Sequence, residues 1–210
     1  LNKENLEALK QGLVNIEKHL TNIRDHYGMP CVVSVNHFTF DTEAEIKLLR
    51  EKIESLGGTF VVAKHWAEGG KGAEDLARAV TKVVDNSKAK HTFVYPDDLP
   101  LTEKIRAVAT KIYNAGQVTF ADAAKKQLDE WNKDYGQFPV CMAKTQMSLT
   151  ADPNVRGAPA GHTLNVREVR LSNGAGFIVA ICGEIMTMPG LPKVPAAEKI
   201  DIDETGSITG

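Results

Sequence analysis

The sequence has little that would place it in a membrane or on a nucleic acid. No run approaches the roughly 18 to 20 consecutive apolar residues that a bilayer requires. The N-terminus, LNKENLEALK, resembles neither a signal sequence nor a transit peptide. The 25 Lys and Arg are interleaved with 27 Asp and Glu, for a net charge of −2, so no basic stripe exists to bind phosphates. We expect neither a membrane segment nor a nucleic-acid partner.

Cysteine is also scarce. Cys31, Cys141 and Cys182 lie far apart, and each stands in an apolar run, where a reduced thiol behaves as a small hydrophobic group. The HxH, HExxH and CxxC spacings of metal sites are missing. We therefore predict no disulfide, no metal site and a cytoplasmic location.

The remaining composition is that of a soluble globular protein. The 210 residues are 42% hydrophobic and 25% charged, which suits one large domain or two modest ones. The chain starts at Leu1 instead of Met and stops without an obvious terminator, so we expect a fragment or a processed chain.

Apolar periodicity predicts alternating helices and strands in the first 90 residues. A helical stripe runs through residues 3–27, and Gly28 and Pro30 end it before an apolar strand at 31–35. A capping box, Thr42 with Glu45, opens a second helix that precedes a strand at 59–63 and a helix at 73–86. Strands separated by a helix are parallel. We predict an α/β fold, a parallel sheet with flanking helices.

The pattern changes near residues 88–96, where two prolines flank an acidic turn. Beyond it we predict surface helices starting at Thr102 and near residue 121, and strands at 140–144, 164–171 and 176–181. A break in apolar alternation at Glu168 indicates a bulge, and 172–175 has hairpin-turn chemistry. The proline-rich tail, 186–195, is expected to be a packed loop. We predict two domains, an α/β domain at residues 1–90 and a smaller α+β domain at residues 91–210.

Small ligands bind outside the carboxyl ends of parallel strands. Phe38 and Trp66 follow the first two strands by two or three residues, so their rings would overhang one crevice and could sandwich a flat ligand. The alternative is that both rings plug the top of the core.

Other polar groups at this edge have two interpretations each. Asn36 and Asp41 could read the hydrogen-bonding edge of a base, or they could simply form a turn. Gly69–Gly72 could bind a carboxylate, but a flexible turn is favoured, because the segment lacks the GxxxxGK[ST] pattern of a phosphate loop. Residues 144–146 (KTQ) offer ligand groups or a solvated loop. His37 and His65 flank the aromatic pair without metal-ligand spacing.

Five motifs in order closely resemble those of the formate-tetrahydrofolate ligase family. They are NxFxxDTxxE at 36–45, WAxGGxG at 66–72, PVCxAKTQxSL at 139–149, GAGF at 174–177 and GEIMTMPGLP at 183–192. The resemblance extends over the whole chain. It implies an enzyme that joins formate to tetrahydrofolate with ATP, giving 10-formyltetrahydrofolate by way of formyl phosphate. It also implies Mg²⁺, a monovalent cation, a P-loop NTPase-like core and a homotetramer.

The resemblance further implies that this chain is the C-terminal part of such an enzyme, without the ATP phosphate loop and the catalytic residues. Phe38 and Trp66 fall on the family positions whose rings sandwich the pterin, while Asn36 and Asp41 match positions that serve nucleotide or substrate. The isolated part is then expected to be inactive and to hold no cofactor. Alternatives are a free-standing module that binds another flat heterocycle or a partner protein, and the synthetase region of a eukaryotic multifunctional enzyme.

Overall fold

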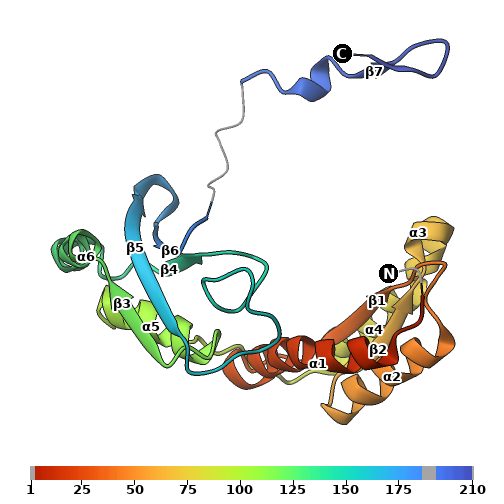
Figure 1. Cartoon of the computed structure of the whole chain (residues 1–210), viewed down its shortest axis with the longest axis horizontal. Helices are drawn as coiled ribbons and strands as arrows, with labels where there is room; N and C mark the ends of the chain where they lie inside the picture. Colours follow the sequence, from red (N-terminus) through yellow and green to blue (C-terminus); the bar gives the residue numbers. More distant parts are fainter. Residues whose placement is uncertain (1–2, 186–192, 210) are drawn as a thin grey trace.

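A computed structural model of the chain describes residues 3–185 and 193–209, and it contains a parallel sheet, a mixed sheet and a short hairpin (Figure 1). No helix in this described part combines the length and apolar character needed to cross a bilayer. The buried residues form two main clusters, one drawn from residues 20–60 and one from residues 101–182.

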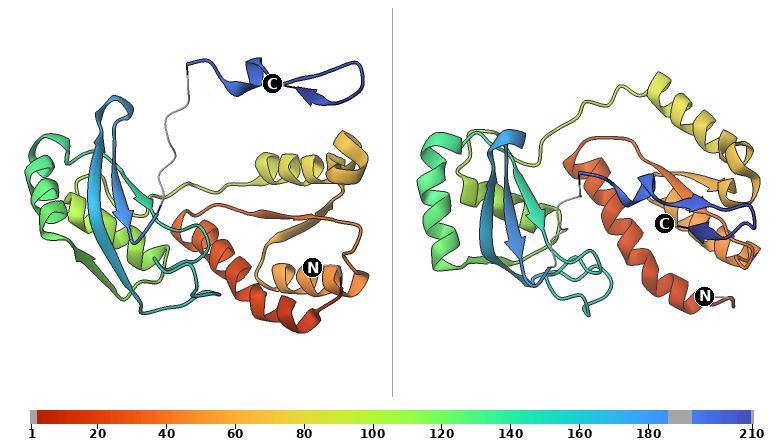
Figure 2. Two further views of the ribbon diagram at one scale, coloured as in Figure 1. Left: turned by 45° about the horizontal axis from the view of Figure 1, so that its top comes forward. Right: turned by 90° about the horizontal axis from the view of Figure 1, so that it is seen from above.

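The first cluster lies against the parallel pair predicted from the sequence. Strands β1 (Val32–Asn36) and β2 (Thr59–Ala63) pair in register, from Val32 opposite Thr59 to Asn36 opposite Ala63. Helices α1 (Leu6–Thr21) and α2 (Glu43–Ser55) cover one face of this pair, where Phe60 is buried with Ile53. Helix α4 (Glu74–Asn86) packs on the other face (Figure 2). The predicted order of helices and strands is confirmed.

Local signals in the first 60 residues act as predicted. The Thr42 hydroxyl accepts from the Glu45 amide and the Glu45 carboxylate accepts from the Thr42 amide, which completes the capping box. Helix α1 continues into a π-helical turn, η1 (Asn22–His26), and Gly28 follows with φ of +66°. The left-handed conformation at Gly28 redirects the chain toward β1.

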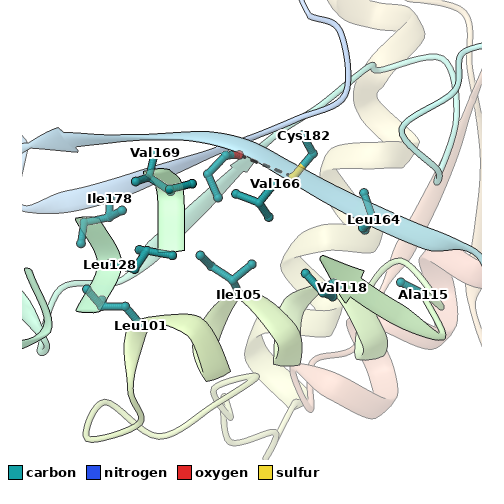
Figure 3. Packing of buried hydrophobic residues seen from close by; sticks show 13 residues of the cluster. Leu101, Ile105, Ala115, Val118, Leu128, Leu164, Val166, Val169, Ile178 and Cys182 are labelled. Carbon is teal, nitrogen blue, oxygen red and sulfur yellow. Dashed lines mark hydrogen bonds between the residues drawn. The ribbon is translucent and has the colours of Figure 1, made fainter. Parts of the chain in front are cut away.

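The second cluster packs against a four-stranded mixed sheet, in which the strands are ordered β3-β5-β6-β4. Its strands are β3 (Gln117–Phe120), β4 (Val140–Ala143), β5 (Thr163–Ser172) and β6 (Phe177–Cys182). Helices α5 (Leu101–Lys111) and α6 (Asp122–Tyr135) pack on it, and Figure 3 shows Leu101, Ile105 and Leu128 facing strand residues Val166 and Ile178. With 13 buried residues against four, this core is the more extensive, although we expected the second domain to be the smaller.

The second part of the chain differs from the prediction in two details and agrees with it in a third. Helix α5 starts at Leu101 with Pro100 in the cap position, so Thr102 lies inside the helix and does not cap it. Strand β3 was missed because four residues between two helices carry too little alternation to be recognised. The β-bulge is confirmed by a register shift between Val166 and Glu168 in the antiparallel β5–β6 pair.

The C-terminal segment contains a small hairpin that the sequence did not predict. The structure has a 3-10 turn, η4 (Ala196–Glu198), followed by β7 (Asp201–Ile202) and β8 (Ile208–Thr209), which pair in antiparallel. Of the tail predicted to be a packed loop, residues 186–192 lie outside the described residues, and 193–195 are exposed.

Helix α1 connects the two parts through the C-terminus of α5. The Lys18 ammonium donates to the Lys111 carbonyl at 2.8 Å, and the Asn22 side-chain amide donates to the Ile112 carbonyl at 3.0 Å. Positive charge at a helix C-terminus is favourable because the last carbonyls lack partners within the helix. Burial lowers the pKa of Lys18.

We propose that residues 1–90 and 91–210 are two domains, because each of these parts of the chain has its own buried cluster.

Two glycines in this region should respond to alanine in opposite directions. A Cβ at Gly28 would combine a left-handed φ with a contact 2.8 Å from the Lys90 carbonyl oxygen, so Gly28→Ala should lower the free energy of unfolding by about 1–3 kcal/mol. Gly12 lies inside α1 with open space around it, so Gly12→Ala should raise it by about 0.5–1 kcal/mol. Urea unfolding of both variants checks this, and equal shifts would contradict it.

Candidate functional site at the carboxyl edge of the parallel strands

The aromatic pair predicted from the sequence forms an exposed contact at the carboxyl ends of β1 and β2. Phe38 stands two residues beyond β1, and Trp66 lies in the short helix α3 (His65–Glu68) directly after β2. The ring centroids are 5.8 Å apart with a 55° angle between the planes. Phe38 is 42% exposed and Trp66 is 65% exposed. The alternative, that both rings plug the core, is therefore wrong.

The slot between the rings is closed. A planar ligand inserted between two rings needs about 3.5 to 4 Å of separation on each side, or roughly 7 to 8 Å in total. The centroids, at 5.8 Å, are closer than that. A flat ligand can enter only if one ring moves by about 1 to 2 Å and the two planes, 55° apart, turn toward parallel.

Asp41 holds the loop that carries Phe38. Its carboxylate Oδ2 accepts from the Phe38 backbone N–H at 2.8 Å, and its own N–H donates to the Phe38 carbonyl at 3.1 Å. Asp41 thus does act as a turn-forming residue, as one of the two interpretations had it. Asn36, at the end of β1, is exposed, and its side chain makes no hydrogen bond to any residue that the structure describes.

A close backbone contact holds the loop that carries Trp66. The Lys64 N–H donates to the Gly72 carbonyl at 2.9 Å, and a Cβ at Gly72 would lie 2.5 Å from the Lys64 carbonyl oxygen. Residues Gly69–Ala73 form a 3-10 turn, η2, that leads into α4. The segment thus forms a strand-to-helix turn, as we favoured, and at Gly72 this turn is closely packed, whereas we had expected it to be flexible.

A cavity of about 750 Å³ borders Phe38. Leu9 and Ala8 of α1, Val35 of β1, and Ile46 and Leu49 of α2 form its apolar wall. Its polar lining consists of Lys3, Glu4, Asn5, Asn36, Asp41 and Glu45. The cavity was not predicted from the sequence, although Leu9 belongs to the apolar stripe of residues 3–27 and Ile46 and Leu49 lie in the helix that the capping box predicted.

The two helix N-termini beside this cavity are joined by one carboxylate. Glu45 accepts from the Asn5 backbone N–H at 3.1 Å and from the Thr42 N–H at 3.2 Å. These bonds lower the pKa of Glu45, with the bond from Asn5 as the largest cause. Both Glu45 oxygens are thus engaged, and the first turns of α1 and α2 are fixed against each other.

Lys144 organises a loop in the second part of the chain. Its Nζ donates to the carbonyls of Thr145, Ser148 and Thr150 and lies 4.7 Å from the centroid of the Tyr113 ring. Burial lowers the pKa of Lys144. Residues 144–146 therefore belong to a loop that hydrogen bonds from the Lys144 ammonium hold in place. Gln146 lines a small cavity of about 290 Å³ in this loop.

The described residues hold no cluster of three or more potential metal ligands, and His37 and His65 belong to none. Burial raises the pKa of Cys31, and it raises the pKa of Cys182 to about 11 with only partial opposition from Lys144, so neither of these two thiols is an activated nucleophile. The site therefore offers two exposed aromatic rings as a stacking surface, without a metal-ligand cluster among the described residues.

The Trp66 loop should depend on Gly72 and not on Gly70. A Cβ at Gly72 meets the Lys64 carbonyl, whereas one at Gly70 has nothing within 4 Å. Gly72→Ala should displace α3 and weaken the near-UV circular dichroism of the Phe38–Trp66 pair, while Gly70→Ala should leave it unchanged. An unchanged spectrum for Gly72→Ala would contradict the contact.

Comparison with known proteins gives a consistent result. The sequence model of the formate-tetrahydrofolate ligase family matches residues 1–210. The chain is 62% identical over 210 residues to the formate-tetrahydrofolate ligase of Methylococcus capsulatus. It is 56% identical over 217 residues to that of Methylibium petroleiphilum and 54% identical over 211 residues to that of Rhizobium rhizogenes. All of this chain is covered in each case, and it spans 38% of the length of these relatives.

Proposed function

The chain belongs to the formate-tetrahydrofolate ligase family, and from that premise we propose that it is the folate-binding portion of an enzyme that joins formate to tetrahydrofolate. Phe38 and Trp66 would hold the pterin between their rings. The observation that supports this role most is the exposure of two adjacent rings at the carboxyl edge of parallel strands, where α/β folds bind ligands.

The physical logic of the pair is that a pterin is a planar bicycle with two faces to cover. An isolated pair of rings is worth about 0.5–1.5 kcal/mol beyond burial, and a ring inserted between them gains contact on both faces. Asp41 and Gly72 hold the backbones of the two loops, so we expect rotation of the two side chains to open the slot. The pair would thus close on the ligand without refolding either loop.

The remaining steps belong to the complete protein. In the reaction we propose, a formate oxygen attacks the γ-phosphoryl of ATP and releases ADP, because formate itself is a poor acyl donor. N10 of the folate then attacks the carbonyl carbon of formyl phosphate, loses its proton and releases inorganic phosphate. We propose ATP, Mg²⁺ and a monovalent cation as the cofactors of this reaction. Residues 1–90 would form part of a P-loop NTPase-like core. The complete protein would be a cytoplasmic homotetramer.

We expect no ATP phosphate site at Gly69–Gly72, because the segment lacks the GxxxxGK[ST] pattern. The turn at Gly69–Ala73 also folds back on Lys64, where a Cβ at Gly72 would lie 2.5 Å from the Lys64 carbonyl oxygen. We therefore assign phosphoryl transfer to other residues of the complete protein. The contribution of this chain is to bind and orient the folate.

The isolated chain should have no ligase activity. Mixed with ATP, formate and tetrahydrofolate, it should release no ADP, because we expect the phosphate loop and the catalytic residues to lie in the part of the enzyme that this chain does not include. A coupled assay for ADP measures this directly. Turnover by the pure chain would refute the assignment of phosphoryl chemistry to other residues.

Folate binding should depend on the aromatic pair. Tetrahydrofolate should quench tryptophan fluorescence, and Trp66→Ala should abolish the quenching. Trp131→Ala serves as the matched control, because Trp131 lies on α6 and packs against the other core. Phe38→Ala should weaken binding by about tenfold, in line with the loss of one stacking face.

Retention of quenching in Trp66→Ala would contradict the proposed site. Quenching by flat heterocycles in general, with no preference for folate, would instead favour a free-standing heterocycle-binding module. Binding of a protein and of no heterocycle would favour a partner-docking role.

A further inference from the structure

The small cavity in the second part of the chain has no role in the proposed folate function. It has a volume of about 290 Å³ and is lined by α1 on one side and by the loop that follows β4 on the other. The described residues of its lining are Asn15, His19, Tyr113, Met142 and residues 144–149. None of them is an aspartate or a glutamate, whereas His19 and Lys144 are basic. The charge of this lining favours an anion.

The Lys144 ammonium turns carbonyl groups of the loop inward. Its Nζ donates to the carbonyl oxygens of Thr145 and Ser148. The peptide bonds of the described residues are trans, and in a trans peptide unit the C=O and the following N–H point in opposite directions. The N–H groups that follow these two carbonyls belong to Gln146 and Leu149. Both N–H groups therefore point away from the ammonium.

These two N–H groups are free to bind a ligand. Neither donates to a residue that the structure describes, although Gln146 and Leu149 both line the cavity. The Tyr113 hydroxyl, in the same lining, likewise makes no hydrogen bond to a described residue. Peptide N–H groups that face one hollow form an anion-binding site even without a charged side chain in contact with the ligand.

We propose that this cavity binds a small oxyanion, a carboxylate or a phosphoryl group, through the N–H groups of Gln146 and Leu149 and the Tyr113 hydroxyl. An oxyanion has several acceptor sites, so donors from two segments of the chain can meet on it. The volume lies at the lower limit of small-molecule sites, which suits a small anion or the end of a larger ligand.

Lys144 shapes this site without touching the anion. Its three N–H groups are used by the carbonyls of Thr145, Ser148 and Thr150, so the ammonium supplies positive charge and holds the loop. Residues 144–146 then do offer ligand groups, one of the two interpretations that the sequence left open, but through the backbone. The site stands on the second part of the chain alone and is independent of the proposed folate function.

The test is a titration of the 210-residue chain with inorganic phosphate, followed by NMR through the backbone amide resonances. We expect the Gln146 and Leu149 resonances to shift and to saturate with a Kd on the order of 1 mM, the affinity of a few hydrogen bonds to one small anion. Sodium chloride at the same ionic strength is the control and should leave them in place. An equal shift with chloride would overturn the proposal.

A conservative variant tests the hydroxyl donor. Tyr113→Phe removes one hydrogen bond but keeps the ring that lies 4.7 Å from the Lys144 ammonium, so the loop should remain in place. We expect phosphate to bind about tenfold more weakly, because hydrogen bonds to charged groups are the stronger ones. Tyr135→Phe is the matched control, since Tyr135 packs against the same core outside the cavity. Equal Kd values in the two variants would overturn the proposal.

A second probe separates the two sources of an oxyanion. Inorganic phosphate represents a phosphoryl group, and N-(4-aminobenzoyl)glutamate represents the carboxylates of a folate tail without the pterin. Tighter binding of phosphate supports a phosphoryl site, and tighter binding of the glutamate compound supports a carboxylate site. If neither probe shifts the Gln146 and Leu149 resonances, the cavity binds no oxyanion and the proposal is wrong.

Discussion

The in-register parallel pairing of β1 with β2 is the constraint on which the candidate site depends. Because Asn36 lies opposite Ala63, the chain leaves both strands at the same edge, and Phe38 and Trp66 follow within two or three residues. A shift of one residue in this register would turn the strand side chains to the opposite face and displace the two loops relative to each other. The buried contacts of Phe60 and Ile53 hold this register.

The site combines rigid loops with movable rings. Hydrogen bonds from Asp41 and Lys64 fix the backbone on either side of the slot, whereas the Phe38 and Trp66 side chains are largely exposed. Such a division suits the stacking site that we propose, in which rotation of the two side chains would admit a planar ring. It also explains why Gly72 must be glycine, because the Trp66 loop folds directly onto the Lys64 carbonyl.

Strong local signals in the sequence predicted the first part of the fold well. The helical stripe of residues 3–27, the capping box at Thr42 and two β-branched strands specify their structures through neighbours that are close in sequence. Strand β3 and the cavity beside Phe38 depend on residues that meet only after folding, such as Leu9 with Val35 and Leu49. The aromatic pair was predictable from its position after the strands, but the closed slot, at 5.8 Å, was not.

The most direct test of the central claim is a crystal structure of the chain with tetrahydrofolate bound. We predict that the Phe38 and Trp66 centroids, 5.8 Å apart without ligand, separate to roughly 7 to 8 Å with the pterin between them. A complex in which the rings remain in contact and the pterin lies elsewhere would contradict it.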